Sequence, residues 1–230
     1  MKKQEGPGKI GFTHCVLLSG GLDSTTLLAW VKNESPAQRI VAYTFVYGQK
    51  HAVEVEAARA VADYYGIEHH VAEIPVIRGS ALTEPGIPLP EGRDLRAASG
   101  VAPSYVPARN LVFLAQMAAV QDAVGPGVLW LGVHHDDHTG YPDCRPEFIQ
   151  AVDQAVNLGT KYGLRVQAPF VTWSKSEIIR WGLAHGVPYE LTHSCYQGRR
   201  PACGLCDTCQ ARLKAFAEVG AQDPIPYASQ

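Results

Sequence analysis

The stretch Leu17-Leu18-Ser19-Gly20-Gly21-Leu22-Asp23-Ser24-Thr25-Thr26 decides the fold. Its first two residues end an apolar run at 15–18, and a second apolar segment follows at 27–31. The pattern therefore predicts a strand, a tight turn and a helix. The two glycines let the backbone approach a ligand closely and adopt a positive φ. Backbone N–H groups at the start of the new helix, with the hydroxyl groups around them, then favour a phosphate site.

This turn differs from the two common glycine-rich nucleotide motifs. No lysine follows Gly21, as G-x-x-x-x-G-K-[ST] requires, and the G-x-G-x-x-G spacing is also absent. Ser-Gly-Gly-x-Asp-Ser instead suits the pyrophosphate released when ATP gives up AMP, and it resembles the PP-loop of the N-type ATP pyrophosphatases. The alternative is a glycine-rich turn capped by Ser24. We expect the nucleotide to be bound by Leu18, Ser19, Gly20, Gly21, Leu22, Asp23, Ser24, Thr25 and Thr26.

Strand and helix patterns alternate along most of the chain. Strands are predicted at 39–45, 68–74, 128–133 and 165–168, and helices at 50–65, 111–124, 146–159 and from an N-cap at Ser174 to His185. The alternation predicts an α/β fold with a doubly wound, mainly parallel five-stranded sheet. We expect residues 1–187 to form this domain and residues 188–230 a small C-terminal module. The proline-rich segment 75–107 is interpreted as a substrate loop or lid.

Composition limits the class of protein. The chain has 230 residues, 46% hydrophobic and 18% charged, with a net charge of −2 and no long basic run. These values predict a globular protein without stable nucleic-acid binding. No apolar stretch is long enough to span a membrane, and the N-terminus lacks the apolar region of a signal peptide. We therefore expect a cytoplasmic protein that does not bind membranes.

Four cysteines near the C-terminus follow the spacing C-x7-C-x2-C-x2-C. Four thiolates suit the closed tetrahedral site of a structural zinc ion. The alternative is an iron–sulfur cluster, although Gln210 stands where ferredoxin-type sequences usually have a proline. We predict a Zn²⁺ site formed by Cys195, Cys203, Cys206 and Cys209.

Eight stretches in the same order give a wider resemblance. They are LLSGGLDSTT, YGQKHAVEVEAA, VPARN, GYPDCRPEF, NLGTK, SKSEII, GVPYELTHSCYQG and CGLCDTC. Together they resemble the QueC family of queuosine-precursor biosynthesis, whose fold is adenine nucleotide alpha hydrolase-like. GYPDCRPEF and the four cysteines are the most selective of them, because many adenylating enzymes share the PP-loop.

The resemblance implies a reaction. A carboxylate of 7-carboxy-7-deazaguanine attacks the α-phosphate of ATP, and ammonia displaces AMP from the acyl-adenylate to give an amide. A second ATP activates the amide oxygen, and loss of AMP leaves the nitrile of 7-cyano-7-deazaguanine. The implied cofactors are ATP, Mg²⁺ and Zn²⁺, the implied nitrogen source is free ammonia, and the implied assembly is a homodimer.

The resemblance and the positions at strand ends also suggest site residues. Catalytic roles are expected for Lys175, Asp23 and Arg109, which would act on the phosphates or on a carboxylate. Each could instead have a structural role: Lys175 as a solvated surface lysine, Asp23 as a helix cap and Arg109 in a surface salt bridge. Contacts to the deazaguanine are expected from Gln49, His51, Asp137, Asp143, Cys144, Arg145 and Lys161, each of which could instead be a solvated loop residue.

Other functions remain open at this stage. The polar run His134 to His138 contains residue types that bind transition metals, although its place after a strand favours a substrate or Mg²⁺ role. A relative of the family could transfer the same activated acid to another amine, for example on a protein. A PP-loop tRNA-modifying enzyme or a non-catalytic nucleotide-binding module are further alternatives.

Overall fold

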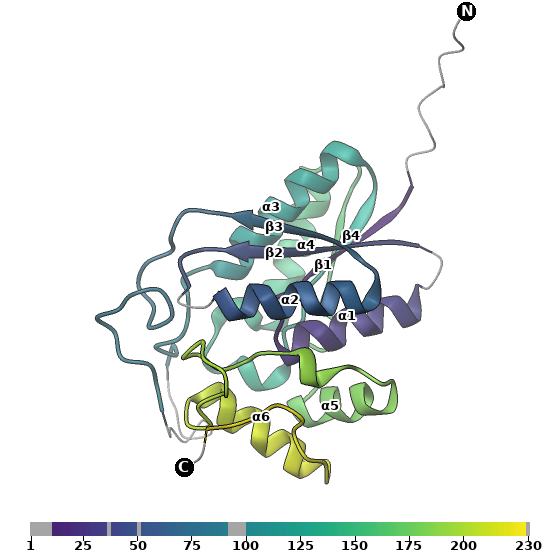
Figure 1. Cartoon of the computed structure of the whole chain (residues 1–230). Coiled ribbons are helices and arrows are strands. Elements are labelled where there is room, and N and C mark those ends of the chain that lie inside the picture. Colours follow the sequence, from purple (N-terminus) through teal and green to yellow (C-terminus); the bar gives the residue numbers. More distant parts are fainter. Residues whose placement is uncertain (1–10, 36–37, 50–51, 92–99, 229–230) are drawn as a thin grey trace, which may run out of the picture.

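Five parallel strands form one sheet in the order β3-β2-β1-β4-β5 in the computed structural model, which describes residues 11–35, 38–49, 52–91 and 100–228. The strands are β1 (Thr13–Leu17), β2 (Arg39–Val46), β3 (Glu68–Glu73), β4 (Gly127–Trp130) and β5 (Arg165–Gln167). The main helices are α1 (Leu22–Glu34), α2 (Ala52–Tyr65), α3 (Arg109–Val124), α4 (Pro146–Gly159), α5 (Lys175–Ala184) and α6 (Asp207–Glu218) (Figure 1). The predicted α/β class and five-stranded parallel sheet are confirmed.

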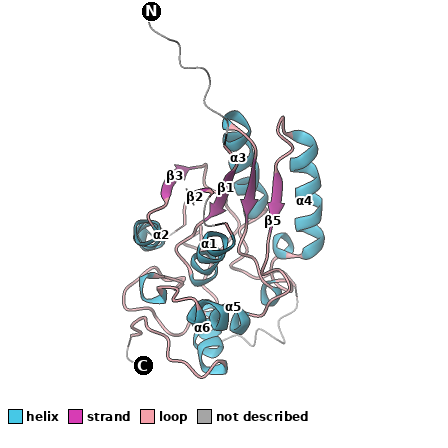
Figure 2. Cartoon of the chain, turned by 90° about the vertical axis from the view of Figure 1, so that its right-hand side faces the viewer, coloured by secondary structure: helices cyan, strands magenta, loops and turns pink. Residues whose placement is uncertain are grey.

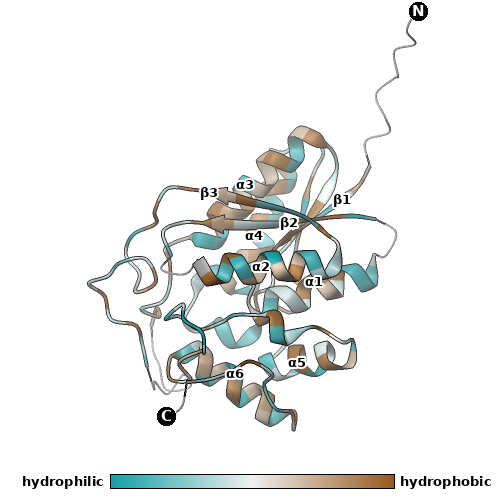
Figure 3. Ribbon diagram, in the orientation of Figure 1, coloured by the Kyte–Doolittle hydropathy of each residue, from teal (hydrophilic) through white to brown (hydrophobic). Residues whose placement is uncertain are grey.

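Helices cover both faces of the sheet. Val16 of β1 is fully buried in one apolar cluster with Leu28 of α1 and Val61 of α2. Cys15, which points to the opposite face because side chains alternate along a strand, lies in a second cluster with Phe113 of α3 and Val152 of α4. Figure 2 shows α1 and α2 on one side of the sheet and α3 and α4 on the other. β2 carries mostly hydrophobic residues, whereas the edge strands β3 and β5 carry mostly hydrophilic ones, and hydrophilic residues are frequent on the helices (Figure 3).

The order in which strands are added to the sheet changes at β1: β2 and β3 lie on one side of it, and β4 and β5 lie on the other. Strand β1 pairs in parallel with β2 on one side and with β4 on the other. At such a switch point the carboxyl ends of two neighbouring strands lead to opposite sides, which opens a crevice where ligands bind. The loop after β1 lies in this crevice. A Cβ added to Gly132, just after β4, would lie 3.4 Å from the backbone oxygen of Asp23.

The C-terminal segment contains a helix, α6, that the sequence pattern did not predict. It packs against α5 (Figure 1), and its Phe216 belongs to the same apolar cluster as Leu28 of α1. Upstream of α6, the backbone N–H of His193 donates a hydrogen bond of 2.9 Å to the carbonyl of Gly20. The segment from 188 onward is therefore held directly against the turn after β1.

The described parts of the proline-rich segment, 75–91 and 100–107, pack on the carboxyl edge of the sheet. The N–H of Ala81 donates to the carbonyl of Pro103 at 2.9 Å, and the N–H of Ala102 donates to the carbonyl of Gly140 at 3.0 Å. Leu82 is buried as a result. Among the residues that the structure describes, no helix has the length and apolar character needed to cross a membrane.

Candidate active site

The turn after β1 is shaped by Gly20, whose φ is +81°. A Cβ at this position would lie 2.4 Å from the carbonyl oxygen of Glu54 and 2.5 Å from the backbone nitrogen of Ala58, so that any side chain would collide with the backbone of α2. Ser24 supports the turn from within, because its Oγ accepts the N–H of Ser19 at 3.1 Å and donates to the carbonyl of Gly21 at 3.2 Å. The result is a narrow loop at the positive end of α1.

The predicted nucleotide-binding residues divide into two groups. Leu18, Ser19, Gly21, Asp23 and Ser24 line the adjoining cavity. Gly20, Leu22, Thr25 and Thr26 are buried and do not line it. The hydroxyl of Thr26 donates to the carbonyl of Leu22 and lies 2.9 Å from the Tyr189 hydroxyl, so this side chain faces the core and not the cavity.

Lys175 reaches the turn from α5. Its Nζ donates to both carboxylate oxygens of Asp23, at 2.8 and 2.9 Å. The predicted capping box is confirmed: Ser174 accepts the N–H of Glu177 at 3.3 Å, and Glu177 accepts the N–H of Ser174 at 2.7 Å. This cap fixes the helix start directly before Lys175, and Lys175 is therefore presented to the cavity.

Asp23 stays ionised in this setting. Its burial would raise its pKa, but the charge of Lys175 and the electrostatic interaction with His134 outweigh burial and hold the pKa below its ordinary value. The imidazole of His134, which follows β4, is 2% exposed. Its Nε2 lies 3.7 Å from Asp23 Oδ2 and 3.3 Å from Asp137 Oδ2. One buried histidine thus connects two of the predicted site carboxylates.

Arg109 is the first residue of α3. It follows Ala108, whose φ of 51° is unusual for a residue other than glycine. The N–H of Ala108 donates to the Tyr105 hydroxyl at 2.8 Å. The guanidinium of Arg109 donates to the Tyr47 hydroxyl at 3.2 Å. Burial would lower the pKa of Arg109, but Tyr47 and nearby acidic groups raise it overall, so the charge is permanent.

Asp143 is bound to the start of α3. Its Oδ2 accepts the N–H of Asn110 at 3.0 Å, and the Asn110 side chain donates to the Asp143 carbonyl at 3.0 Å. These bonds connect the predicted segments VPARN and GYPDCRPEF and hold Arg109 in place. Cys144, the next residue, does line the cavity. Burial raises the pKa of the Cys144 thiol, which favours its neutral form as a wall of the cavity.

The other predicted substrate residues lie at different places. Gln49 lines the cavity, but its amide is engaged with the backbone N–H of Tyr47 at 2.7 Å and the carbonyl of Phe45 at 3.0 Å. Arg145 is exposed and donates to the carbonyl of His138 at 3.0 Å. Lys161 precedes β5, which puts it at the amino edge of the sheet, away from the cavity. His51 lies outside the described residues.

Two adjoining cavities form one cleft at the carboxyl edge of the sheet. The larger lobe, about 250 Å³, contains Lys175, His134, Ser104 and Tyr141 in its wall. The smaller lobe, about 210 Å³, is lined by apolar side chains from the strand ends and from α3. The lobes share a wall of Ser19, Gly21, Asp23, Glu54, Leu82, Arg109, Asp137, Cys144 and Tyr196.

The sequence patterns do not assign Glu54 or Tyr196 to this cleft. They favour a substrate or Mg²⁺ role for the run 134–138 because the run follows a strand, but only Asp137 is assigned individually from this run, and His134 is not. Glu54 and Tyr196 do not follow a predicted strand. Only the packing of α2 and of the cysteine segment brings them to the cavity.

The four cysteines form a buried group beside the cleft. Their sulfur atoms all lie within 4.8 Å of one another. The N–H groups of Leu205 and Cys206 donate to the sulfur of Cys203, at 3.4 and 3.3 Å. The group can hold a metal ion, and Tyr196, the neighbour of Cys195, extends from it into the cleft wall.

Known proteins are similar in sequence to this chain over most of its length. The sequence model of a family described as Queuosine biosynthesis protein QueC matches residues 13–220. A 7-cyano-7-deazaguanine synthase of Desulfitobacterium hafniense is 42% identical over 94% of this chain and 93% of its own. One of Thermoplasma acidophilum is 44% identical over 92% of this chain and 90% of its own. Among solved structures, a predicted subunit of a tRNA methyltransferase from Methanocaldococcus jannaschii aligns with a TM-score of 0.49 and 15% identity, covering 95% of this chain and 93% of that one.

Proposed function

This chain belongs to the QueC family of queuosine biosynthesis proteins, and we propose that it converts 7-carboxy-7-deazaguanine and ammonia to 7-cyano-7-deazaguanine at the expense of ATP. The observation that carries this proposal is the shared wall of the two-lobed cleft. A reaction between a carboxylate and the α-phosphate of ATP needs two sites that meet at one point. The cleft has two lobes, and the pyrophosphate-type turn lies where they join.

We assign the smaller lobe to the adenosine of ATP. Its walls include Phe45, Phe113, Leu131 and Val133 from the strand ends and α3, which suit a planar base. The deazaguanine then occupies the larger lobe. The hydroxyls of Ser104, Tyr141 and Tyr196 form a chain in its wall, with separations of 2.6 and 3.2 Å, and can exchange hydrogen bonds with the polar edge of a purine-like ring.

The chain's own residues then act on the charges of the reaction. The backbone of Gly21, the hydroxyl of Ser19 and the ammonium of Lys175 receive the leaving pyrophosphate. Arg109, which is permanently charged and reaches both lobes, orients the substrate carboxylate and stabilises charge at the α-phosphate. Cys144 contributes shape and no covalent step, because acyl transfer through an adenylate needs no protein nucleophile.

The donor sets fit the two metals that the family resemblance implies. Asp23 and Asp137 offer hard carboxylate oxygens on either side of His134 Nε2, and they would hold Mg²⁺. When bound, Mg²⁺ neutralises phosphate charge. Four sulfur atoms within 4.8 Å fit Zn²⁺, which would fix the segment from His193 to Tyr196 against the cleft.

Incubation with 7-carboxy-7-deazaguanine, ATP, Mg²⁺ and ammonium tests the proposal, with products identified by mass spectrometry. We expect AMP, pyrophosphate and the nitrile, with the amide as an intermediate. Absence of both AMP and the nitrile would overturn the proposal. Formation of AMP without amide or nitrile would instead favour a different amine as the acceptor, and the same assay with candidate proteins in place of ammonium would identify it.

A further inference from the structure

Glu54 differs from the other acidic residues around it. Asp23 accepts hydrogen bonds from Lys175, Asp136 accepts the N–H of Lys175 at 2.9 Å, and Asp137 lies 3.3 Å from His134. The Glu54 carboxylate has no hydrogen-bond or ion-pair partner within the described part of the chain. It belongs to the shared wall of the cleft and thus faces both lobes.

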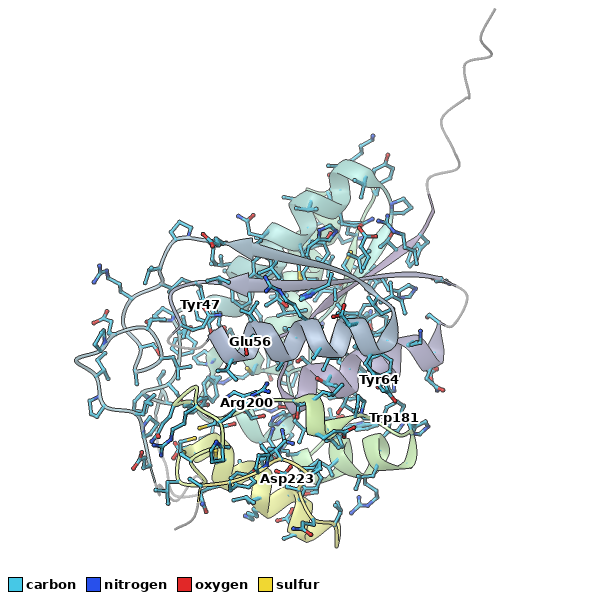
Figure 4. The ribbon with its side chains drawn as sticks, in the orientation of Figure 1. Tyr47, Glu56, Tyr64, Trp181, Arg200 and Asp223 are labelled. Atoms are coloured by element: carbon cyan, nitrogen blue, oxygen red, sulfur yellow. The ribbon has the colours of Figure 1, made fainter. Side chains whose placement is uncertain are left out.

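The position of Glu54 is fixed by the fold. It lies in the first turn of α2, and its carbonyl oxygen is the atom that a side chain at Gly20 would strike. The same backbone therefore supports the pyrophosphate-type turn and directs a carboxylate into the cleft. Figure 4 shows Tyr47, the hydrogen-bond partner of Arg109, near the first turns of this helix. Glu54 and Arg109 thus flank the point at which the lobes meet.

The proposed reaction requires an acceptor for protons on nitrogen. In the first transfer, the nitrogen lone pair of ammonia forms the C–N bond, the C–O bond to AMP breaks, and one proton leaves nitrogen. In the second activation, the amide oxygen attacks the α-phosphorus, pyrophosphate leaves, and nitrogen loses another proton. In the last step an N–H bond breaks, its electron pair forms the third C–N bond, and the C–O bond to AMP breaks.

We propose that Glu54 is the catalytic base that accepts these nitrogen protons and passes them to solvent. The inference rests on the proposed function, because only a reaction that makes an amide or a nitrile needs this base. The reacting carbon must lie beside the α-phosphate, which is where the two lobes meet. Asp23 and Asp136 are engaged with Lys175, and Asp137 lies beside His134. Asp207 lines only the larger lobe, so Glu54 is the carboxylate of the shared wall that is left to take up a proton there.

The electrostatic surroundings of Glu54 agree with this role. Burial raises the pKa of Glu54 to about 7, while the charge of Arg109 at the start of α3 opposes the rise and Cys195 adds to it. The other acidic and basic side chains of the cleft wall are Asp23 of α1, Lys175 of α5, His134, Asp136 and Asp137 after β4, and His193 and Asp207 of the C-terminal segment. A base with a pKa near the working pH is the most effective proton acceptor.

The test separates adenylation from the nitrogen steps. Adenylation of the carboxylate releases no nitrogen proton, and exchange of labelled pyrophosphate into ATP measures it alone. We expect Glu54→Gln to slow this exchange by less than about threefold and to slow amide and nitrile formation by about 10²–10⁴-fold. Glu54→Asp should recover part of the lost rate. Glu56→Gln is the matched control, because Glu56 is an exposed residue of the same helix (Figure 4).

A pH profile gives a second readout. In the unmodified protein, nitrile formation from the amide should rise as the pH passes through about 7, and Glu54→Gln should abolish that rise. An equal loss of exchange and nitrile formation in Glu54→Gln would assign the residue a purely structural role and overturn the inference. Normal nitrile formation in that variant would also overturn it. If the unmodified protein gives no AMP at all, the proposed function itself fails.

Discussion

Lys175 and Asp23, 152 residues apart in sequence, are joined by two hydrogen bonds from one ammonium group to both oxygens of one carboxylate. The pair explains how an acidic side chain can stand beside the proposed phosphate-binding turn without repelling a polyanion. Lys175 offsets the charge of Asp23, and both groups remain beside the cavity, where the lysine can turn to phosphate and the carboxylate to a cation. The turn after β1 and the start of α5 therefore form one functional unit.

Replacement of Lys175 by methionine should reduce AMP formation by at least about 10²-fold, because the charge that we propose receives the leaving pyrophosphate is lost. The measurement is the initial rate of pyrophosphate release with saturating ATP. Lys214→Met is the control: Lys214 is exposed on α6 and lies 3.9 Å from Glu218. We expect it to match the parent protein. Full activity of Lys175→Met would remove Lys175 from the reaction.

The same pair should be visible in the pH dependence of stability. The folded-state pKa of Asp23 lies below its ordinary value of 3.8, so ionisation of this carboxyl favours folding. The stabilisation is complete above that ordinary value and is lost as the pH falls through the lowered pKa. Urea unfolding of the parent and of Asp23→Asn between pH 3 and 7 measures this effect. The parent should lose more stability than the variant at the acidic end, and parallel curves would contradict the assignment.

Gly20 can be tested against another glycine of similar backbone conformation. Gly20→Ala should lower the free energy of unfolding by about 2–5 kcal/mol, since its φ is positive and its Cβ would meet the backbone of α2. Gly66→Ala should cost only about 1–2 kcal/mol, because Gly66 has a φ of +64° but open space around it. Only the first variant should lose pyrophosphate release. Equal effects of the two variants would show that the contact with α2 is unimportant.

Much of the fold could be predicted because the hydrophobic patterns that specify its strands and helices are local in the sequence. The strands and helices alternate, and only the ends of elements shift: α3 begins at Arg109 and not at Leu111, and β4 ends at Trp130 and not at Val133. Helix α6 could not be predicted in this way. Its buried face includes Arg212, which is 2% exposed and pairs with Asp223 at 2.7 Å, and a hydrophobic pattern treats an arginine as solvent-facing.

The same distinction applies to the site. Asp23, Arg109 and Lys175 lie in recognisable segments, and the structure brings all three to one cleft. Glu54 also lies in one of the matching stretches, YGQKHAVEVEAA, but it could not be singled out from the sequence, because a glutamate in an amphipathic helix is usually solvated. Lys161 shows the converse, since a segment that resembles the family lies at the opposite edge of the sheet from the cleft. Membership of a segment that resembles the family therefore does not establish contact with a substrate.

Asp143 offers a test of positioning against substrate contact. Asp143→Ala removes the acceptor for the N–H of Asn110, so the start of α3 should lose about 1 kcal/mol and Arg109 should be displaced. Asp143→Asn keeps an acceptor oxygen at this place. We expect pyrophosphate release to fall much more in Asp143→Ala than in Asp143→Asn. If both variants lose activity equally while their melting temperatures stay unchanged, Asp143 acts on the substrate through its charge.

The cysteine group should bind one zinc ion per chain, which elemental analysis of the purified protein can measure. Cys206→Ser should lose most of this metal and about 3 kcal/mol of stability, equivalent to a fall in melting temperature of about 6–12 °C for a chain of this size. Because Tyr196 follows Cys195 and lines both lobes, the variant should also have a higher KM for the deazaguanine acid. Cys15→Ala is the control, since Cys15 is buried in β1 and bonds to Gln121, and its metal content should be unchanged. Iron in place of zinc, or full metal content in Cys206→Ser, would contradict the assignment.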